Sequence, residues 1–167
     1  MDSDSVTLAA ANATKSALGT VKLVNGFFNP LTSGKNCVII AAHVATVSGT
    51  PAGPYFWNFI NGVTVNSAAT GTIRSALLGS VYTSVVTPQV NVAVTVIGGA
   101  TTALTQFSVM GGPAAIAAGA GLYDAYDEVD GGIVVPPGTL VGITATGAGK
   151  SHVVQSTIRW KEVNVIP

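Results

Sequence analysis

Turn-forming residues interrupt this sequence at near-regular spacing, and they limit its regular structure to short segments. Asn61-Gly62 is the strongest of these signals, because both positions tolerate the positive φ angles of a two-residue β-hairpin. Gly98-Gly99 and residues 135–138, Val-Pro-Pro-Gly, mark further turns. Residues 90–97 alternate with the period of a strand, and helical periods are absent. The pattern predicts about eight to ten short antiparallel strands in a sandwich or barrel.

The segment at residues 37–47 is apolar on both faces of its expected strand. Ile39 and Val47 lie on one parity, and Ile40 and Val44 lie on the other. A strand that is buried on both sides is typical of the centre of a sheet. This segment is therefore expected to be a central strand or to contact another subunit.

The domain organisation is expected to be simple. No break in composition divides residues 21–167, so they are predicted to form a single β-sandwich domain. Residues 1–20 are small and polar, without strong hydrophobic periodicity, and are expected to form an N-terminal arm. A short helix over residues 8–18 is the alternative for part of this arm.

Formal charge is almost missing from the middle of the chain. Between Val38 and Tyr123 the only formally charged side chain is Arg74. Charged residues make up 8% of the chain, against roughly 25% in an ordinary soluble domain. Either Ser, Thr, Asn and Gly coat this surface, or much of it is buried against other subunits. We favour burial, because obligate interfaces resemble a domain core cut in half.

Several functional classes do not fit this composition. The formal net charge is +0, which leaves no electrostatic footprint for DNA or RNA. No segment reaches the roughly 20 apolar residues that a membrane span needs. The acidic start lacks the basic and then apolar pattern of a secretory signal, so synthesis in a cytoplasm is expected. Cys37 is the only cysteine, which excludes an intrachain disulfide.

Residues 147–151, Gly-Ala-Gly-Lys-Ser, end like a phosphate-binding P-loop. The complete motif has glycine where this chain has Thr144, and a helix follows it. The residues that follow Ser151 here have the pattern of a strand. A β-turn with an exposed Lys150 is therefore the favoured interpretation.

Four carboxylates cluster at residues 123–132, namely Asp124, Asp127, Glu128 and Asp130. Calcium binding is one interpretation, since calcium takes several oxygen ligands. The spacing does not match the EF-hand pattern, so a solvated acidic loop, or one that pairs with basic residues of another subunit, is favoured.

No other pattern of reactive residues predicts catalysis or a metal site. His43, His152 and Cys37 are not spaced as zinc ligands. The sequence contains no Gly-x-Ser-x-Gly nucleophile elbow and no pair of carboxylates on rigid elements. We therefore expect no enzymatic activity and no cofactor.

Aromatic residues are concentrated in residues 55–60. Alternation along a strand would place half of them in the core, and core packing is the favoured interpretation. If exposed, Tyr55, Trp57 and Phe59 are the candidate interaction residues, able to stack on a sugar or to anchor a partner.

Two segments resemble structural proteins of tailed bacteriophages. Residues 26–40, GFFNPLTSGKNCVII, resemble a turn that leads into an apolar strand in small phage structural proteins. Residues 135–140, VPPGTL, and 158–163, IRWKEV, resemble the closing strands of jelly-roll virion proteins. The resemblance implies an all-β, antiparallel jelly-roll-like sandwich that forms a homotrimer.

The function implied by this resemblance is structural. The first hypothesis is a capsid decoration or cement protein of the virion, which binds the major capsid protein and stabilises the phage head. In this hypothesis, the arm at residues 1–20 lies along a neighbouring subunit. The alternative is a carbohydrate- or receptor-binding module of a tail or fibre, motivated by the aromatic stripe.

Overall fold

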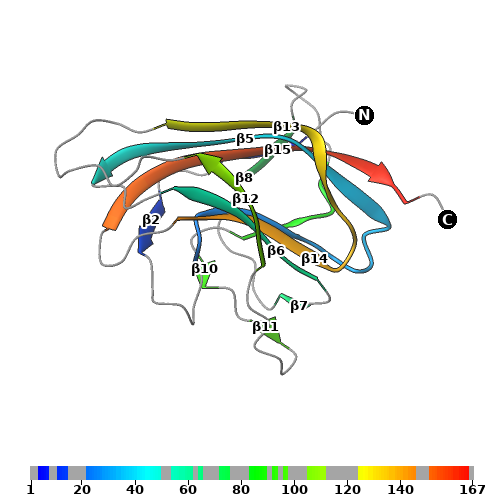
Figure 1. Cartoon of the computed structure of the whole chain (residues 1–167). Helices are drawn as coiled ribbons and strands as arrows, with labels where there is room; N and C mark the ends of the chain where they lie inside the picture. Colours follow the sequence, from blue (N-terminus) through cyan, green and yellow to red (C-terminus); the bar gives the residue numbers. More distant parts are fainter. Residues whose placement is uncertain are drawn as a thin grey trace.

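The computed structural model describes residues 4–7, 11–14, 22–49, 54–61, 64–65, 72–75, 83–89, 92–93, 96–97, 105–111, 124–145 and 151–165. These residues form strands and no helix, arranged mainly in two facing sheets (Figure 1). Within the described ranges, no helix has the length and hydropathy needed to cross a bilayer.

The larger sheet has the strand order β13-β5-β15-β1-β8, with β2 also paired to β15. Its strands are β1 (Asp4–Thr7), β2 (Ala11–Thr14), β5 (Lys35–Gly49), β8 (Thr72–Ser75), β13 (Asp124–Val135) and β15 (Ser151–Asn164). The long strand β5 pairs with β13 on one side and with β15 on the other, which confirms the prediction of a central strand over residues 37–47.

The smaller sheet has the strand order β12-β6-β14-β4-β9. Its strands are β4 (Asn25–Asn29), β6 (Tyr55–Asn61), β9 (Thr87–Pro88), β12 (Thr105–Gly111) and β14 (Thr139–Ala145). Two short ladders complete the described strands: β3 (Lys22–Leu23) with β10 (Val92–Ala93), and β7 (Thr64–Val65) with β11 (Val96–Ile97).

The strand order is that of a jelly roll. Eight strands, β1, β4, β5, β6, β12, β13, β14 and β15, are numbered here first to eighth in chain order. One sheet then runs sixth, third, eighth, first, and the other runs fifth, fourth, seventh, second. All of these pairs are antiparallel, as in two interlocked Greek keys. The predicted all-β, antiparallel jelly-roll-like sandwich is confirmed.

Part of the predicted N-terminal arm at residues 1–20 belongs to the larger sheet. β1 lies between β15 and β8, and β2 pairs with the start of β15. The alternative helix over residues 8–18 is wrong at Ala11–Thr14, which is strand. The weak hydrophobic periodicity of this segment does not predict these strand pairings. The placement of the arm along a neighbouring subunit stays a prediction.

The acidic segment predicted as a loop at residues 123–132 is instead most of strand β13. Asp124 to Glu128 pair with β5, and the register resumes at Ile133. Between these two parts the backbone turns at Asp130 and Gly131, whose φ angles are 43° and 84°. Asp-Gly in this left-handed pair makes a tight turn within the edge strand. The four carboxylates obscure the alternation of buried and exposed residues from which this strand could have been predicted.

The core lies between the two sheets. Phe27 of β4 packs on Trp160 of β15, with ring centroids 4.7 Å apart. Trp57 and Tyr55 of β6 are fully buried beside them. Both sheets contribute aliphatic residues to the same cluster, among them Ile39, Val44, Val141, Ile143 and Ile158.

The turn between β4 and β5 forms as predicted from Asn-Pro and Ser-Gly. The Ser33 amide donates a hydrogen bond to the Pro30 carbonyl at 3.0 Å, and Gly34 has a φ of 64°. The buried Asn29 side chain donates from Nδ2 to the carbonyls of Lys35, at 2.8 Å, and Val135, at 3.0 Å. This asparagine therefore ties the turn to the end of β13.

Candidate functional site

The three aromatic residues predicted as interaction residues do not lie on one surface. Tyr55 and Trp57 are fully buried, and Phe59 is half-buried. All three point toward the facing sheet, because they share one parity of β6. Tyr55 and Trp57 pack in the core, which is the interpretation favoured from the sequence. These two residues therefore do not form an exposed aromatic stripe.

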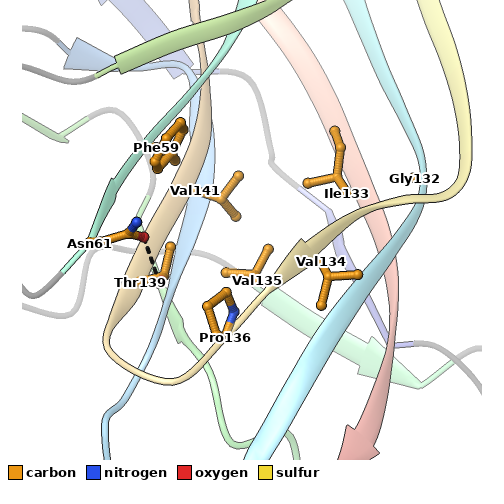
Figure 2. A pocket seen from close by; sticks show the side chains of 9 residues that line it. All are labelled: Phe59, Asn61, Gly132, Ile133, Val134, Val135, Pro136, Thr139 and Val141. Atoms are coloured by element: carbon orange, nitrogen blue, oxygen red, sulfur yellow. Dashed lines mark hydrogen bonds between the residues drawn. The ribbon is translucent and has the colours of Figure 1, made fainter.

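Phe59 lines a cavity of about 420 Å³ between β6, β14 and β13 (Figure 2). Val141 and Val135 point toward one another across this space from β14 and β13 (Figure 2). At its end the Thr139 hydroxyl donates a hydrogen bond to Asn61 Oδ1 at 2.9 Å. The cavity is therefore an apolar space with two polar side chains at its rim.

Trp57 connects the two sheets at this edge of the sandwich. Its indole Nε1 donates a hydrogen bond to Asp127 Oδ2 at 2.9 Å. Asp127 lies on the inward parity of β13, between the exposed residues Tyr126 and Glu128. One of the four carboxylates considered for calcium is thus turned away from the others and toward the core.

The remaining carboxylates of β13 do not gather into a metal site. Among the residues that the structure describes, no group of three or more His, Cys, Asp or Glu side chains is placed to hold a metal ion. Asp124 instead contacts His43 Nε2 on the neighbouring strand, and the Tyr126 ring lies edge-on to His43 with centroids 6.3 Å apart. The favoured alternative to calcium included pairing with basic residues of another subunit, and this stays open.

The P-loop-like segment, His152 and Cys37 are the remaining candidates from the sequence. Residues 147–150 of the P-loop-like segment lie outside the described residues, and the residues after Ser151 are strand, as predicted. His152 is the second residue of this strand and pairs with Gly49 of β5. Cys37 is buried on the inner side of β5, and burial, assisted by the nearby Glu162 carboxylate, raises the pKa of its thiol to about 12.

Glu162 has a buried side chain that the sequence did not single out. Its side chain is 3% exposed and forms an ion pair with Lys35 Nζ at 3.2 Å. Ser84 Oγ donates to Glu162 Oε1 at 2.5 Å, and the Val85 amide donates to the same oxygen at 3.2 Å. These contacts attach residues 83–89 to the end of β15. Lys35 and Glu162 are far apart in sequence, so no local sequence pattern predicts that they form a pair.

The outward side of β13, β5 and β15 carries residues in four cross-strand rows, here called the four-row face. The rows, read from β13 across β5 to β15, are Asp124–Ala45–Gln155, Tyr126–His43–Thr157, Glu128–Ala41–Arg159 and Val134–Val38–Lys161. In every row the outer β13 residue is exposed, and the β5 residue is half-buried or buried. The intervening residues, such as Ala125, Val44 and Ser156, point inward and are buried.

Charge is divided by sign across this face. Its β13 side is acidic, through Asp124 and Glu128, and its β15 side is basic, through Arg159 and Lys161. Glu128, Arg159 and Lys161 form no ion pair with another described residue. Exposed apolar side chains accompany them, with Tyr126 57% and Val134 53% exposed. In a chain this poor in charge, the division of sign marks the face as a candidate contact surface.

Comparisons with protein-family models, with curated proteins and with solved structures find no match to this chain.

Proposed function

We propose that this chain is a structural protein of a virion that decorates the capsid as a homo-oligomer. The jelly-roll strand order supports this, because that architecture recurs in viral capsid domains. The resemblance of residues 26–40, 135–140 and 158–163 to phage structural proteins supports the same assignment. The proposed partners are further copies of the chain, as a homotrimer, and the major capsid protein.

The observation that carries the proposal is the surface of the sandwich. Large apolar side chains are exposed on a chain with very few charges, among them Leu31 at 76% and Val163 at 41%. Leu31 lies in the turn after β4, and Val163 lies near the end of β15, where the Val165 amide bonds to the Gly34 carbonyl. Exposed apolar groups that are rimmed by polar ones are typical of protein contacts. The proposal assigns this end of the sandwich to a partner in the particle.

Particle binding tests this function. The purified chain would be mixed with capsids of the virus that encodes it, after these are stripped of the chain, and pelleted through a density cushion. Stoichiometric binding that protects the capsid from thermal or low-salt disruption is expected. Leu31→Ser should weaken binding, whereas the matched change at the other sandwich end, Val47→Ser, should not. Capsids that neither bind the chain nor gain stability from it would contradict the proposal.

The cavity at Phe59 favours one second candidate, a sugar-binding module of a tail or fibre. An aromatic ring beside the Asn61 amide and the Thr139 hydroxyl is a chemistry that holds sugars. Glycan-array binding tests it. Phe59→Ala should abolish a genuine signal, and Phe56→Ala, on the opposite side of β6, should not. An array without any bound glycan would remove this candidate.

A further inference from the structure

We propose that a second copy of this chain packs on the four-row face, about a two-fold axis parallel to β5. The proposal deepens the self-association in the proposed function, on which it rests. It assigns a partner to the outward residues of β13, β5 and β15, which lie on the side of this sheet opposite the core.

The arrangement of charge selects this symmetry. An axis along β5 lays β13 of one copy over β15 of the other, and the reverse. Glu128 of each copy then faces Arg159 of the other copy, since Ala41 separates the two residues in one row. A perpendicular two-fold axis, running across the strands, would instead lay acidic β13 over acidic β13. The two charges therefore complement each other only in the first arrangement.

Two of the other three rows agree with the same axis. Tyr126 would face Thr157 of the second copy, and Asp124 would face Gln155, so each pair joins a hydrogen-bond donor to an acceptor. Asp130, in the turn that follows Glu128, would approach the end of β15 that carries Lys161. No row places two like charges opposite one another.

The centre of the face permits close approach. The β5 residues along the axis include Ala41 and Ala45, whose side chains are small, and Val38, which is half-buried. His43 lies on the same line, and its ring is held by Asp124 on the β13 side. Two sheets packed face to face lie about 10 Å apart, with interdigitated side chains. Ala45 on the axis leaves room for longer side chains to cross from each edge, whereas Ala41 is already covered within its own chain, with 2% of its surface exposed.

A two-fold contact makes assemblies with an even number of copies. Together with the trimer of the proposed function, a two-fold axis that crosses the three-fold axis at a right angle closes the assembly at six copies. Charge reversal tests the contact by light scattering behind a sizing column. Glu128→Arg and Arg159→Glu should each halve the mass of the assembly, with a dissociation constant at least about tenfold higher. Glu128→Asp and Arg159→Lys, which keep the charge, are the matched controls and should retain the wild-type mass.

Combining the two charge-reversal substitutions, in one chain or in a mixture, identifies the symmetry of the contact. The chain that carries both Glu128→Arg and Arg159→Glu should recover the wild-type mass. An equal mixture of the two single variants should also recover it, because a two-fold axis pairs each reversed residue with its opposite. Far-ultraviolet circular dichroism would show that each variant is folded, as expected for exposed positions.

The outcomes separate this contact from the proposed function. A wild-type trimer whose mass the reversals leave unchanged would overturn the two-fold contact and keep the proposed function. A wild-type dimer that the reversals dissociate to monomer would keep the contact and contradict the trimer. If the reversals abolish particle binding without a change of mass, the face binds the capsid protein, and the proposal is overturned.

Discussion

The indole of Trp57 on β6 donates a hydrogen bond to the carboxylate of Asp127 on β13, across the edge of the sandwich. Trp57 is fully buried, and Asp127 turns inward from a strand whose neighbouring residues face solvent. The bond therefore fixes which side of β13 faces the core. It also sets which carboxylates remain on the four-row face.

Replacement of this donor should destabilise the fold. Trp57→Phe keeps an aromatic ring but leaves Asp127 without the indole N–H, at an expected cost of about 1–3 kcal/mol. Asp127→Asn, which keeps an acceptor oxygen, should cost less. Urea denaturation followed by circular dichroism measures both. Equal stability of Trp57→Phe and wild type would show that the bond contributes nothing.

Gly26 should not tolerate a side chain. A Cβ at this position would lie 2.5 Å from the Val141 carbonyl oxygen and 2.8 Å from the Gly142 Cα, which are backbone atoms of the paired strand. Gly26→Ala is therefore expected to cost several kcal/mol, on the order of the larger single-residue effects. The control is Gly34→Ala, where nothing lies within 4 Å and only the positive φ of 64° opposes the change. Its expected cost is about 1 kcal/mol. A thermal melt that ranks Gly34→Ala as the more damaging variant would refute this account of Gly26.

The Glu162 carboxylate should be important for stability, because it is buried and attaches residues 83–89 to β15. Glu162→Ala leaves the Ser84 hydroxyl, the Val85 amide and Lys35 without this acceptor, and we expect a loss of about 3–5 kcal/mol. Lys35→Met should cost less, since Lys35 is 26% exposed at its side chain and Glu162 keeps its other donors. Denaturant midpoints test the order of the two variants. A larger loss for Lys35→Met would contradict it.

The Cys37 thiol should make stability depend on alkaline pH. Its pKa is raised from 9.0 to about 12, so the folded chain keeps the thiol proton in a range where the unfolded chain has lost it. The stabilisation is complete below pH 9 and decreases toward pH 12, by up to about 1.4 kcal/mol per pH unit.

Cys37→Ala isolates this effect. The variant should show a flatter dependence of unfolding free energy on pH between 9 and 12 than wild type, whatever its stability at neutral pH. The same burial should protect Cys37 from iodoacetamide at pH 8 until denaturant is added. Rapid alkylation of the folded chain would contradict the burial.

Local signals in the sequence were sufficient for part of the fold. The predicted Asn61-Gly62 hairpin is wrong, because β6 pairs with β12 and β14, and β7 pairs with β11. The strand β5, which is apolar on both faces, the turn at residues 30–34 and the strand after Ser151 form as predicted, because hydrophobic pattern and turn chemistry are properties of neighbouring residues. β13 was missed, because four carboxylates in ten residues obscure alternation, and an Asp-Gly turn interrupts its register. β1 was missed because its pairing with β15 supplies the structure that its own residues do not specify.

The candidate surface could not be read from the sequence. Core packing was the favoured interpretation of the aromatic residues of β6, and it holds for Tyr55 and Trp57, whose parity faces the opposing sheet. The interaction role that they would have had if exposed therefore does not lead to the surface. The four-row face depends on the register of three strands that are distant in the chain. Glu128, Ala41 and Arg159 share a row only through that register.

The molar mass of the purified chain in solution tests the central claim most directly. The chain is 16.7 kDa, and light scattering behind a sizing column measures how many copies associate. We predict a stable assembly of six copies, which charge reversal at Glu128 or Arg159 reduces to three. A stable monomer of 16.7 kDa at all concentrations would contradict the claim that this charge-poor surface is buried between copies.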